Sequence, residues 1–201
     1  MRRWAMTSAM KFLAVTMLCA FVLSSCATPP PLRQFADITF ANLPPLRLSV
    51  ATVAVSSDYR PAMAPPAVDH LFPVPPARAL RRWAKDRLKA AGPRGRARFI
   101  ILDASVKEVP LKIRKGIEGI FYKEQSERYE AVIEARLEII DAMGVVRGRA
   151  RARATRTQTV REDASINARE TVWFEMTEAL MGDFNAEMEK NIRAYLSDWM
   201  M

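Results

Sequence analysis

The alternation of apolar and polar residues is most regular between Tyr129 and Thr159. Five apolar residues at every second position precede a turn, and four arginines at every second position follow it. Period two on both sides of a turn is typical of a β-hairpin with one buried face. The apolar set is Ala131, Ile133, Ala135, Leu137 and Ile139, and the arginine set is Arg147, Arg149, Arg151 and Arg153.

The turn of this predicted hairpin sets which residues face each other across it. A turn centred on residues 142–143 places the charged side chains on one face and the small and apolar ones on the other. A slip of one residue would mix the two sets. The facing pairs in this register are Glu138 with Arg147, Glu134 with Arg151, Arg136 with Arg149, Val132 with Arg153, Leu137 with Gly148, and Ala135 with Ala150.

Two further strands and a helix are predicted upstream of the hairpin. β-Branched residues follow two prolines over 46–55, and apolar side chains alternate over 96–109. Helical spacing, with prolines at the start and a glycine just past the end, predicts a helix over 76–91. The apolar face of the second strand is predicted to be Ile100, Leu102, Ala104 and Val106.

Bulky residues recur every three or four positions over 167–199, which predicts a long amphipathic helix. Asn167, with Glu170 three residues on, resembles a capping box at its start. The stripe is Trp173, Met176, Leu180, Phe184, Met188, Ile192, Tyr195 and Trp199. The element order is therefore β-α-β-β-β-α. We expect an α+β fold, a two-layer sandwich with a mainly antiparallel four-stranded sheet and both helices on one face.

The first residues of the chain have the pattern of an export signal. Basic residues precede any acid, and the apolar run over 12–23 is shorter than the roughly 20 residues of a bilayer span. The stretch Leu23-Ser24-Ser25-Cys26 resembles the lipobox of bacterial lipoproteins. This resemblance implies cleavage before Cys26, diacylation of its side chain and a further acyl group on the new amino terminus. The alternative is an ordinary secretory signal that leaves Cys26 as a free thiol.

Lipidation at Cys26 would make a permanent anchor, because two or more acyl chains hold a protein firmly in a bilayer. Ala27, rather than an aspartate, follows the cysteine. By resemblance to enterobacterial sorting rules, this implies the periplasmic side of the outer membrane. Cys19 would leave with the signal, so we expect no disulfide, no thiol nucleophile and no cysteine-ligated metal.

The prolines suggest where the folded part begins. All 13 prolines lie between Pro29 and Pro110, and the cluster directly after the lipobox favours an extended polyproline II tether. We therefore expect a signal peptide over 1–25, a lipid anchor with a proline-rich tether over 26–44, and a single α+β domain over 45–201.

The charge and the residue inventory narrow the function. Removing residues 1–25 takes away three basic residues and no acid, so the formal net charge falls from +9 to +6. A basic exported protein suits anionic lipid or lipopolysaccharide, and we expect no nucleic-acid partner. His70 is the single histidine, and its pairing with Asp69 in a proline-rich loop is more typical of a turn than of a metal or base site. The seven glycines form no phosphate-binding loop. We expect no enzyme activity, no cofactor and no metal.

The arginines of the predicted hairpin are the sharpest candidate for a binding site. In the predicted register five arginines and three glutamates share one face, a surplus of two positive charges. Guanidinium groups bind phosphate and carboxylate bidentately. Arg136, Arg149 and Arg153 are therefore predicted to bind an anion or a lipid headgroup. The alternative is a solvated face whose ion pairs set the strand register.

The stretch LKIRKGIEGIFYKEQSERY, residues 111–129, is the second candidate. Ile117, Ile120, Phe121 and Tyr122 stand among basic residues, between two strands that a short turn could have joined. Long connections often carry function, and this content suits a membrane surface or a partner groove. The alternative is an extension of the two strands that folds back on the core.

The mature chain as a whole, from lipobox and tether to the long final helix, is similar in architecture to two groups of bacterial lipoproteins. One is the auxiliary lipoprotein of ABC-type intermembrane lipid transport systems. The other is the lipoprotein that plugs the lipopolysaccharide-assembly barrel. The resemblance implies a non-enzymatic accessory protein of envelope lipid transport or assembly, anchored through Cys26, with an envelope protein and an anionic lipid as candidate partners. The alternative is a structural envelope lipoprotein that only binds proteins. A lipid hydrolase would lack a nucleophile–base pair.

Overall fold

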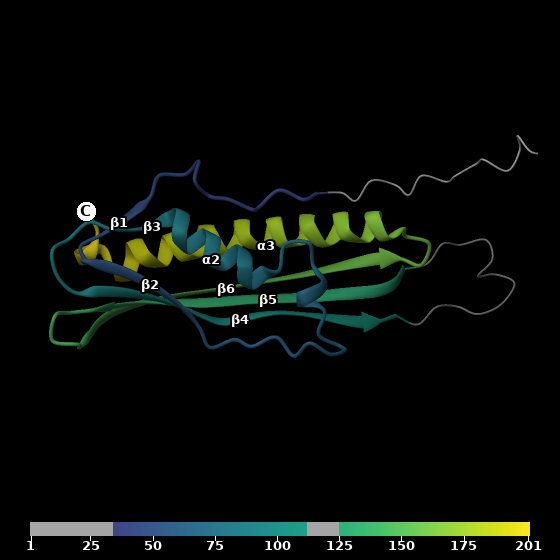
Figure 1. The fold of residues 1–201 in the computed structure, drawn as a ribbon, viewed down its shortest axis with the longest axis horizontal. Coiled ribbons are helices and arrows are strands. Elements are labelled where there is room, and N and C mark those ends of the chain that lie inside the picture. The colour runs from purple at the N-terminus through teal and green to yellow at the C-terminus, as the bar shows by residue number, and fades with distance from the viewer. Residues whose placement is uncertain (1–33, 112–124) are drawn as a thin grey trace, which may run out of the picture. The chain divides into compact units, whose positions relative to one another are not determined.

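Four strands form the main sheet in the order β2-β4-β5-β6 (Figure 1). β2 runs parallel to β4, and the other neighbours are antiparallel. The structure is a computed structural model that describes residues 34–111 and 125–201. The strands of the main sheet are β2 (Thr52–Ser57), β4 (Arg96–Pro110), β5 (Gln125–Ile140) and β6 (Val146–Arg161).

Two helices, α2 (Pro76–Arg87) and α3 (Ile166–Tyr195), lie on the same face of this sheet (Figure 1). Trp83 from α2 and Phe184 from α3 both pack against Phe99 of β4, with ring centroids 5.4 and 6.4 Å from its ring. The predicted α+β fold is confirmed, with a mixed four-stranded sheet. Within residues 34–111 and 125–201, no helix combines the length and the apolar character needed to cross a bilayer.

The predicted strand over 46–55 is in fact two strands. β1 (Leu46–Leu48) pairs in parallel with β3 (Leu88–Ala90) in a separate two-stranded sheet, and the chain then crosses to the main sheet as β2. The predicted helix over 76–91 therefore ends early, at Arg87. The residues after it are extended and hydrogen-bonded to β1, a long-range pairing that helical periodicity cannot show.

A bulge in β4 changes the predicted buried face of that strand. The register with β5 shifts between Ile101 and Asp103. The core side chains are Ala97, Phe99 and Ile101 before the bulge, and Ala104 and Val106 after it. The predicted face is wrong in its first half, because an extra residue in one strand moves the alternation by one position. Ile100 is buried on the opposite face, beside Arg136 of β5.

The hairpin of β5 and β6 is confirmed, but its predicted register is wrong by two residues. The turn after Asp141 has three residues, and Gly144 adopts a φ of 86°, the left-handed conformation that such a turn needs. The Asp141 carboxylate accepts hydrogen bonds from the N–H groups of Met143 and Val145, each at 2.9 Å. A second irregularity, beyond Val146, adds one more residue to β6.

The observed pairs differ from the predicted ones, but the faces do not. The pairs are Glu138 with Arg149, Glu134 with Arg153, Arg136 with Arg151, Val132 with Thr155, Leu137 with Ala150, and Ile139 with Gly148. Two residues are one full period of a strand, so every side chain stays on its predicted side of the sheet.

The ends of α3 differ from the prediction, whereas its middle agrees with it. Ser165 is the N-cap in place of Asn167, and its hydroxyl accepts a hydrogen bond from the N–H of Ala168 at 3.2 Å. At the other end Tyr195 is exposed, and Leu196 enters the core instead. The stripe members between these ends are buried: Trp173, Met176, Leu180, Phe184, Met188 and Ile192.

The bulky stripe of α3 packs against small side chains of β6. These are Ala150, Ala152 and Ala154, all buried. Short side chains let the helix approach the sheet closely. A Cβ at Gly148 would lie 2.6 Å from Cδ2 of Leu196, so a larger residue would push that leucine aside. Asn191 also donates a hydrogen bond to the carbonyl of Arg151 at 2.8 Å, which ties α3 to the outermost strand of the sheet.

A second aromatic cluster closes the core near the start of α3. Phe72 stacks on Trp173 with ring centroids 4.9 Å apart, and Tyr129 meets the same indole edge-on at 5.5 Å. The Tyr129 hydroxyl donates to Glu127 at 2.6 Å, and Arg169 of α3 pairs with that carboxylate at 3.1 Å. Burial and the hydrogen bond to Glu127 raise the pKa of Tyr129, so its hydroxyl keeps its proton.

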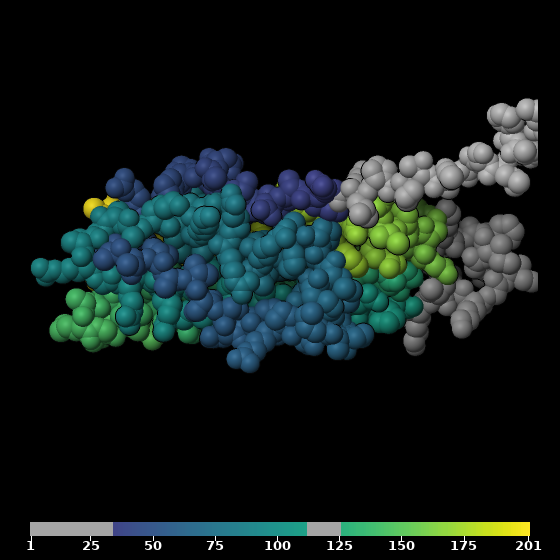
Figure 2. Space-filling view, in the orientation of Figure 1, coloured from purple at the N-terminus to yellow at the C-terminus, as the bar shows by residue number. Residues whose placement is uncertain are grey.

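The described part of the segment predicted as a tether, residues 34–44, lies against both helices. Figure 2 shows it in purple, directly on the helical layer. Phe35 contacts Phe174 of α3, with ring centroids 5.1 Å apart. Arg87, 1% exposed, donates to a backbone carbonyl of this segment and pairs with Glu189 of α3. The rest of the predicted tether lies outside the described residues.

Two glycines give opposite predictions for the same substitution. A Cβ at Gly92 would lie 2.5 Å from the backbone carbon of Ser49, so Gly92→Ala must displace the chain beside β1. We expect it to lower the free energy of unfolding by about 1–3 kcal/mol. At Gly182, in α3, nothing outside the helix's own backbone lies within 4 Å. Gly182→Ala should raise the free energy of unfolding by about 0.5–1 kcal/mol.

Urea denaturation of the two variants would measure both effects. If both variants changed the free energy of unfolding in the same direction, the packing described at Gly92 or at Gly182 would be contradicted.

Candidate functional site

The face of the sheet opposite the helices carries a charged network centred on Glu138. This residue is 3% exposed, and arginines from three strands contact its carboxylate. Arg98 of β4 pairs with it at 2.7 Å, Arg136 of β5 at 3.0 Å and Arg149 of β6 at 3.2 Å. Arg98, Glu138 and Arg149 form one row straight across three strands.

Glu134 is the second centre of the network. It is 5% exposed, Arg153 lies directly opposite it with 3.7 Å between the charged atoms, and Arg151 makes a closer ion pair. We call the seven residues of the network the arginine ladder: Arg98, Arg136, Arg149, Arg151, Arg153, Glu134 and Glu138.

The arginine ladder is buried at its carboxylates and open at its arginines. The side chains of Arg149, Arg151 and Arg153 are 62, 63 and 59% exposed. Asp103 of β4 lies beside Glu134, so five arginines meet three acids and leave a surplus of two positive charges. Each guanidinium has five N–H donors, more than the shared carboxylates can accept. The ladder can therefore bind an external anion without giving up its internal ion pairs.

The electrostatics of the ladder keep its centre ionised. Burial alone would raise the pKa of Glu138, but hydrogen bonds from Arg98 and Arg149 and the charge of Arg136 outweigh it. The pKa therefore lies below its ordinary value of 4.5. At neutral pH the ionised carboxylate orients all three arginines.

The three arginines predicted as an anion site do lie together, but with different partners. Arg149 and Arg153 face Glu138 and Glu134, not Arg136 and Val132 as the predicted register had it. The cause is the three-residue turn and the irregularity in β6. The face still has a surplus of two positive charges, as predicted, but the residues that produce it differ from the predicted ones. Arg147 pairs with Asp141 of the turn at 2.6 Å, and Glu130 pairs with Arg128 at 2.8 Å.

Arg98 was not among the predicted site residues, because it joins through the pairing of β4 with β5, which local alternation does not reveal. The remaining candidates lie outside the described residues: Cys26, Ile117, Ile120, Phe121 and Tyr122.

A second charged surface, absent from the predicted candidates, lies on α2. Arg78, Arg81, Arg82 and Lys85 are spaced as i, i+3, i+4 and i+7, so they form one stripe opposite the buried face of the helix. They line a hollow of about 240 Å³ between α2 and residues 37–38, which we call the basic hollow. The signal is present in the sequence PARALRRWAKDR, where the basic residues repeat at helical spacing.

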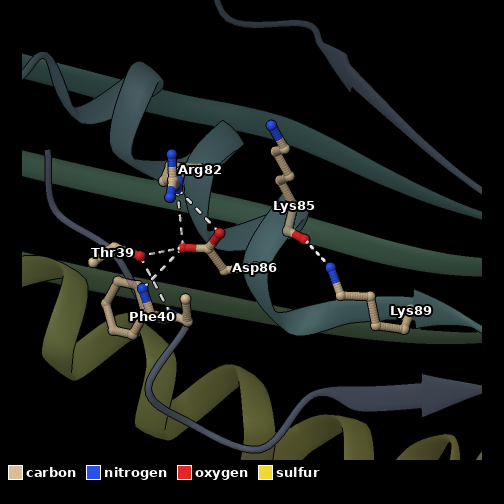
Figure 3. Close-up of polar contacts among 7 residues, drawn as sticks. Thr39, Phe40, Arg82, Lys85, Asp86 and Lys89 are labelled. Atoms are coloured by element: carbon tan, nitrogen blue, oxygen red, sulfur yellow. Dashed lines mark hydrogen bonds and ion pairs between the residues drawn. The ribbon is translucent and has the colours of Figure 1, made fainter.

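Hydrogen bonds to Asp86 hold Arg82, one of the residues that line the basic hollow (Figure 3). The carboxylate accepts from the hydroxyl of Thr39 at 2.7 Å, from the N–H of Phe40 at 3.0 Å and from Nε of Arg82 at 3.0 Å. Burial would raise the pKa of Asp86, but these hydrogen bonds outweigh it and lower the pKa below 3.8. The ionised carboxylate holds both the chain at residues 39–40 and the Arg82 side chain in place.

Residues suited to metal binding do not gather in the part of the chain that the structure describes. No group of three or more His, Cys, Asp or Glu side chains there could hold a metal ion. His70 and Asp69 lie in a single 3-10 turn, Asp69–Leu71. Tyr59 lies in the connector after β2. Burial, together with the charge of Asp69 and a hydrogen bond to it, raises the pKa of Tyr59, so Asp69 stabilises the conformation of this connector.

Comparisons with known proteins give a distant likeness. No family model matches the chain, and no curated protein matches it. Among solved structures, the chain resembles protein XCC0632 from Xanthomonas campestris, described by the family model DUF330. The identity is 11% and the TM-score 0.34, over 80% of this chain and 94% of that one. A likeness of this size carries no statement about activity.

The burial of Glu138 predicts a pH dependence of stability. Its folded-state pKa is lower than its unfolded value, so its contribution is complete above about pH 4.5 and is lost as the pH falls through the folded-state pKa. Glu138→Gln should lower the free energy of unfolding at neutral pH by about 1–3 kcal/mol, because hydrogen bonds to a charged group are lost. It should also flatten the fall in stability on acidification.

Glu130→Gln is the matched control on the same strand and face. Its carboxylate is 43% exposed and paired with Arg128, so the cost should be about 0–1 kcal/mol. Chemical denaturation between neutral pH and about pH 3 would measure both variants. Equal losses at both positions would contradict a special role of the ladder's centre.

Proposed function

We propose that this chain is a non-enzymatic lipoprotein, anchored through acylated Cys26 on the periplasmic side of the outer membrane. It would serve as an accessory component of an envelope lipid-transport or assembly system. The observation that supports this most is the arginine ladder, an array of exposed arginines with surplus positive charge on the face of the sheet opposite the helices. Such an array suits an anionic surface, formed by lipid headgroups or by the acidic face of an envelope protein.

The construction of the ladder favours binding at low entropic cost. Long charged side chains normally lose rotamer freedom when they bind, at about 0.5–1.5 kcal/mol each. Here Glu134 and Glu138, both nearly buried, already hold the arginines in place. A sheet face with pre-oriented guanidinium groups can therefore dock on an anionic surface as a rigid unit.

The alternative function is a structural envelope lipoprotein that binds only other proteins. Lipid that co-purifies with the mature protein would favour the transport role. A stable homo-oligomer without lipid would favour the structural one.

The anchor gives the first test. Cys26→Ser removes the sulfur that would carry the acyl chains, so the variant should incorporate no labelled palmitate and should no longer be recovered in the outer-membrane fraction. Cys19→Ser is the matched control, because that residue would leave with the signal peptide. Normal labelling of the Cys26→Ser variant would rule out lipidation at this position.

The ladder gives the second test, in a vesicle-docking assay. The mature lipidated protein is anchored in phosphatidylcholine vesicles, and docking of separate vesicles rich in phosphatidylglycerol is measured by co-flotation. Arg149→Glu with Arg153→Glu should abolish docking, and Arg149→Gln with Arg153→Gln should weaken it, because surplus charge is lost in both. Docking of the wild type should weaken with salt.

Arg156→Glu with Arg193→Glu is the matched control. It changes the charge equally, at arginines that also have acidic partners but lie with α3 on the other side of the molecule. Docking should persist in this variant. Equal docking by the ladder variants and the wild type would remove the lipid-facing role of the ladder, and photo-crosslinking in cells from Thr155 would then test for a protein partner.

A further inference from the structure

Two of the four basic side chains that line the basic hollow have acidic partners. Arg82 is held by Asp86, 3.0 Å from its Nε. Arg78 pairs with Asp37 at 3.1 Å, but the two side chains are 55 and 60% exposed. A pair this exposed contributes about 1 kcal/mol at most, so an external anion can displace Asp37 from Arg78.

The other two basic side chains, Arg81 and Lys85, are not matched. Among residues 34–111 and 125–201, neither has a carboxylate at ion-pairing distance. Among the described residues, Asp37 lines the hollow and Asp86 pairs with Arg82 beside it, so the four cationic side chains leave a net charge of +2. This density of charge favours a multivalent anion over a single carboxylate.

One of these cations, Arg78, also lies against the dipole of α2, whereas Lys85 in the last turn lies where the dipole favours a cation. The first turn of a helix favours negative charge, yet here it contains no acidic residue and does contain Arg78. The Asp37 carboxylate, 3.1 Å from Arg78, supplies negative charge at this position, and an external anion can replace it. Departures of this kind from local rules are typical of functional sites.

The size and the floor of the hollow restrict its ligand. Its volume of about 240 Å³ is smaller than the pockets, roughly 300–1,000 Å³, that enclose a whole small molecule. The apolar part of the lining consists of Ile38, Val74 and Ala79. This combination suits a charged group joined to a short aliphatic piece, and is too small for an acyl chain.

We propose that the basic hollow binds a phosphate ester group, with Arg81 and Lys85 as its main ligands and Arg78 recruited from Asp37. A guanidinium binds two phosphate oxygens at once, and an ammonium adds a compact charge. The source is a small soluble ester or the headgroup of a lipid, which present the same chemistry. α2 and the arginine ladder lie on opposite faces of the sheet, so this proposal does not rest on the proposed function.

The test is calorimetric titration of the mature lipidated protein in a neutral detergent. The probes are inorganic phosphate, glycerol 3-phosphate and phosphatidic acid added to the micelles. Arg81→Glu with Lys85→Glu should weaken binding at least about tenfold, and Arg81→Gln with Lys85→Gln should weaken it less. Asp37→Asn should tighten binding, because it removes the internal competitor for Arg78.

Arg156→Glu with Arg193→Glu, which lies outside both the basic hollow and the arginine ladder, is the control, and it should leave these affinities unchanged while thermal unfolding shows that each variant is folded. Binding of glycerol 3-phosphate indicates a soluble ester, and binding of phosphatidic acid alone indicates a lipid headgroup. Failure of all three probes to bind, or equal binding by the Arg81 and Lys85 variants and the wild type, overturns the proposal.

Discussion

The close packing of α3 on the small side chains of β6 decides how the rest of the molecule is arranged. Three alanines and Gly148 bring the helix near the sheet, where its bulky stripe fills the core. Side chains of a strand point alternately to its two faces, so the arginines between these alanines must lie on the opposite side. β5 alternates in the same way and places Glu134 and Glu138 there. The same alternation therefore places one set of side chains in the core and the other set, the arginine ladder, on the opposite face.

This origin explains which features could be predicted from the sequence. The faces of β5 and β6 follow from local alternation, and a shift of two residues leaves them unchanged. The partners of each arginine depend instead on the length of the turn and on an irregularity near Val146, which no alternation encodes. The ladder could be predicted as a charged face, therefore, but not as three arginines around Glu138.

Long-range contacts explain most of the other differences between the structure predicted from the sequence and the observed one. Residues 88–90 continue the helical pattern of α2, and only their pairing with β1 makes them a strand. The prolines near residue 44 favour an extended segment, yet the described part of that segment lies against the helices through Arg87 and Asp86. The basic stripe of α2 differs from these cases, because both local spacing and a long-range contact contribute to it. Its spacing is visible in the sequence, but only the chain at residues 37–38 makes it one side of a hollow.

The position of β6 at the edge of the sheet has a consequence for association. An outermost strand offers backbone groups on which another chain could extend the sheet, a route to aggregation. On β6 one of these backbone groups, the carbonyl of Arg151, already accepts a hydrogen bond from Asn191. Closely spaced arginines flank the others. A second copy laid edge to edge would bring two rows of like charge together. The same guanidinium groups that offer an anion site therefore discourage fibrous self-assembly of the sheet.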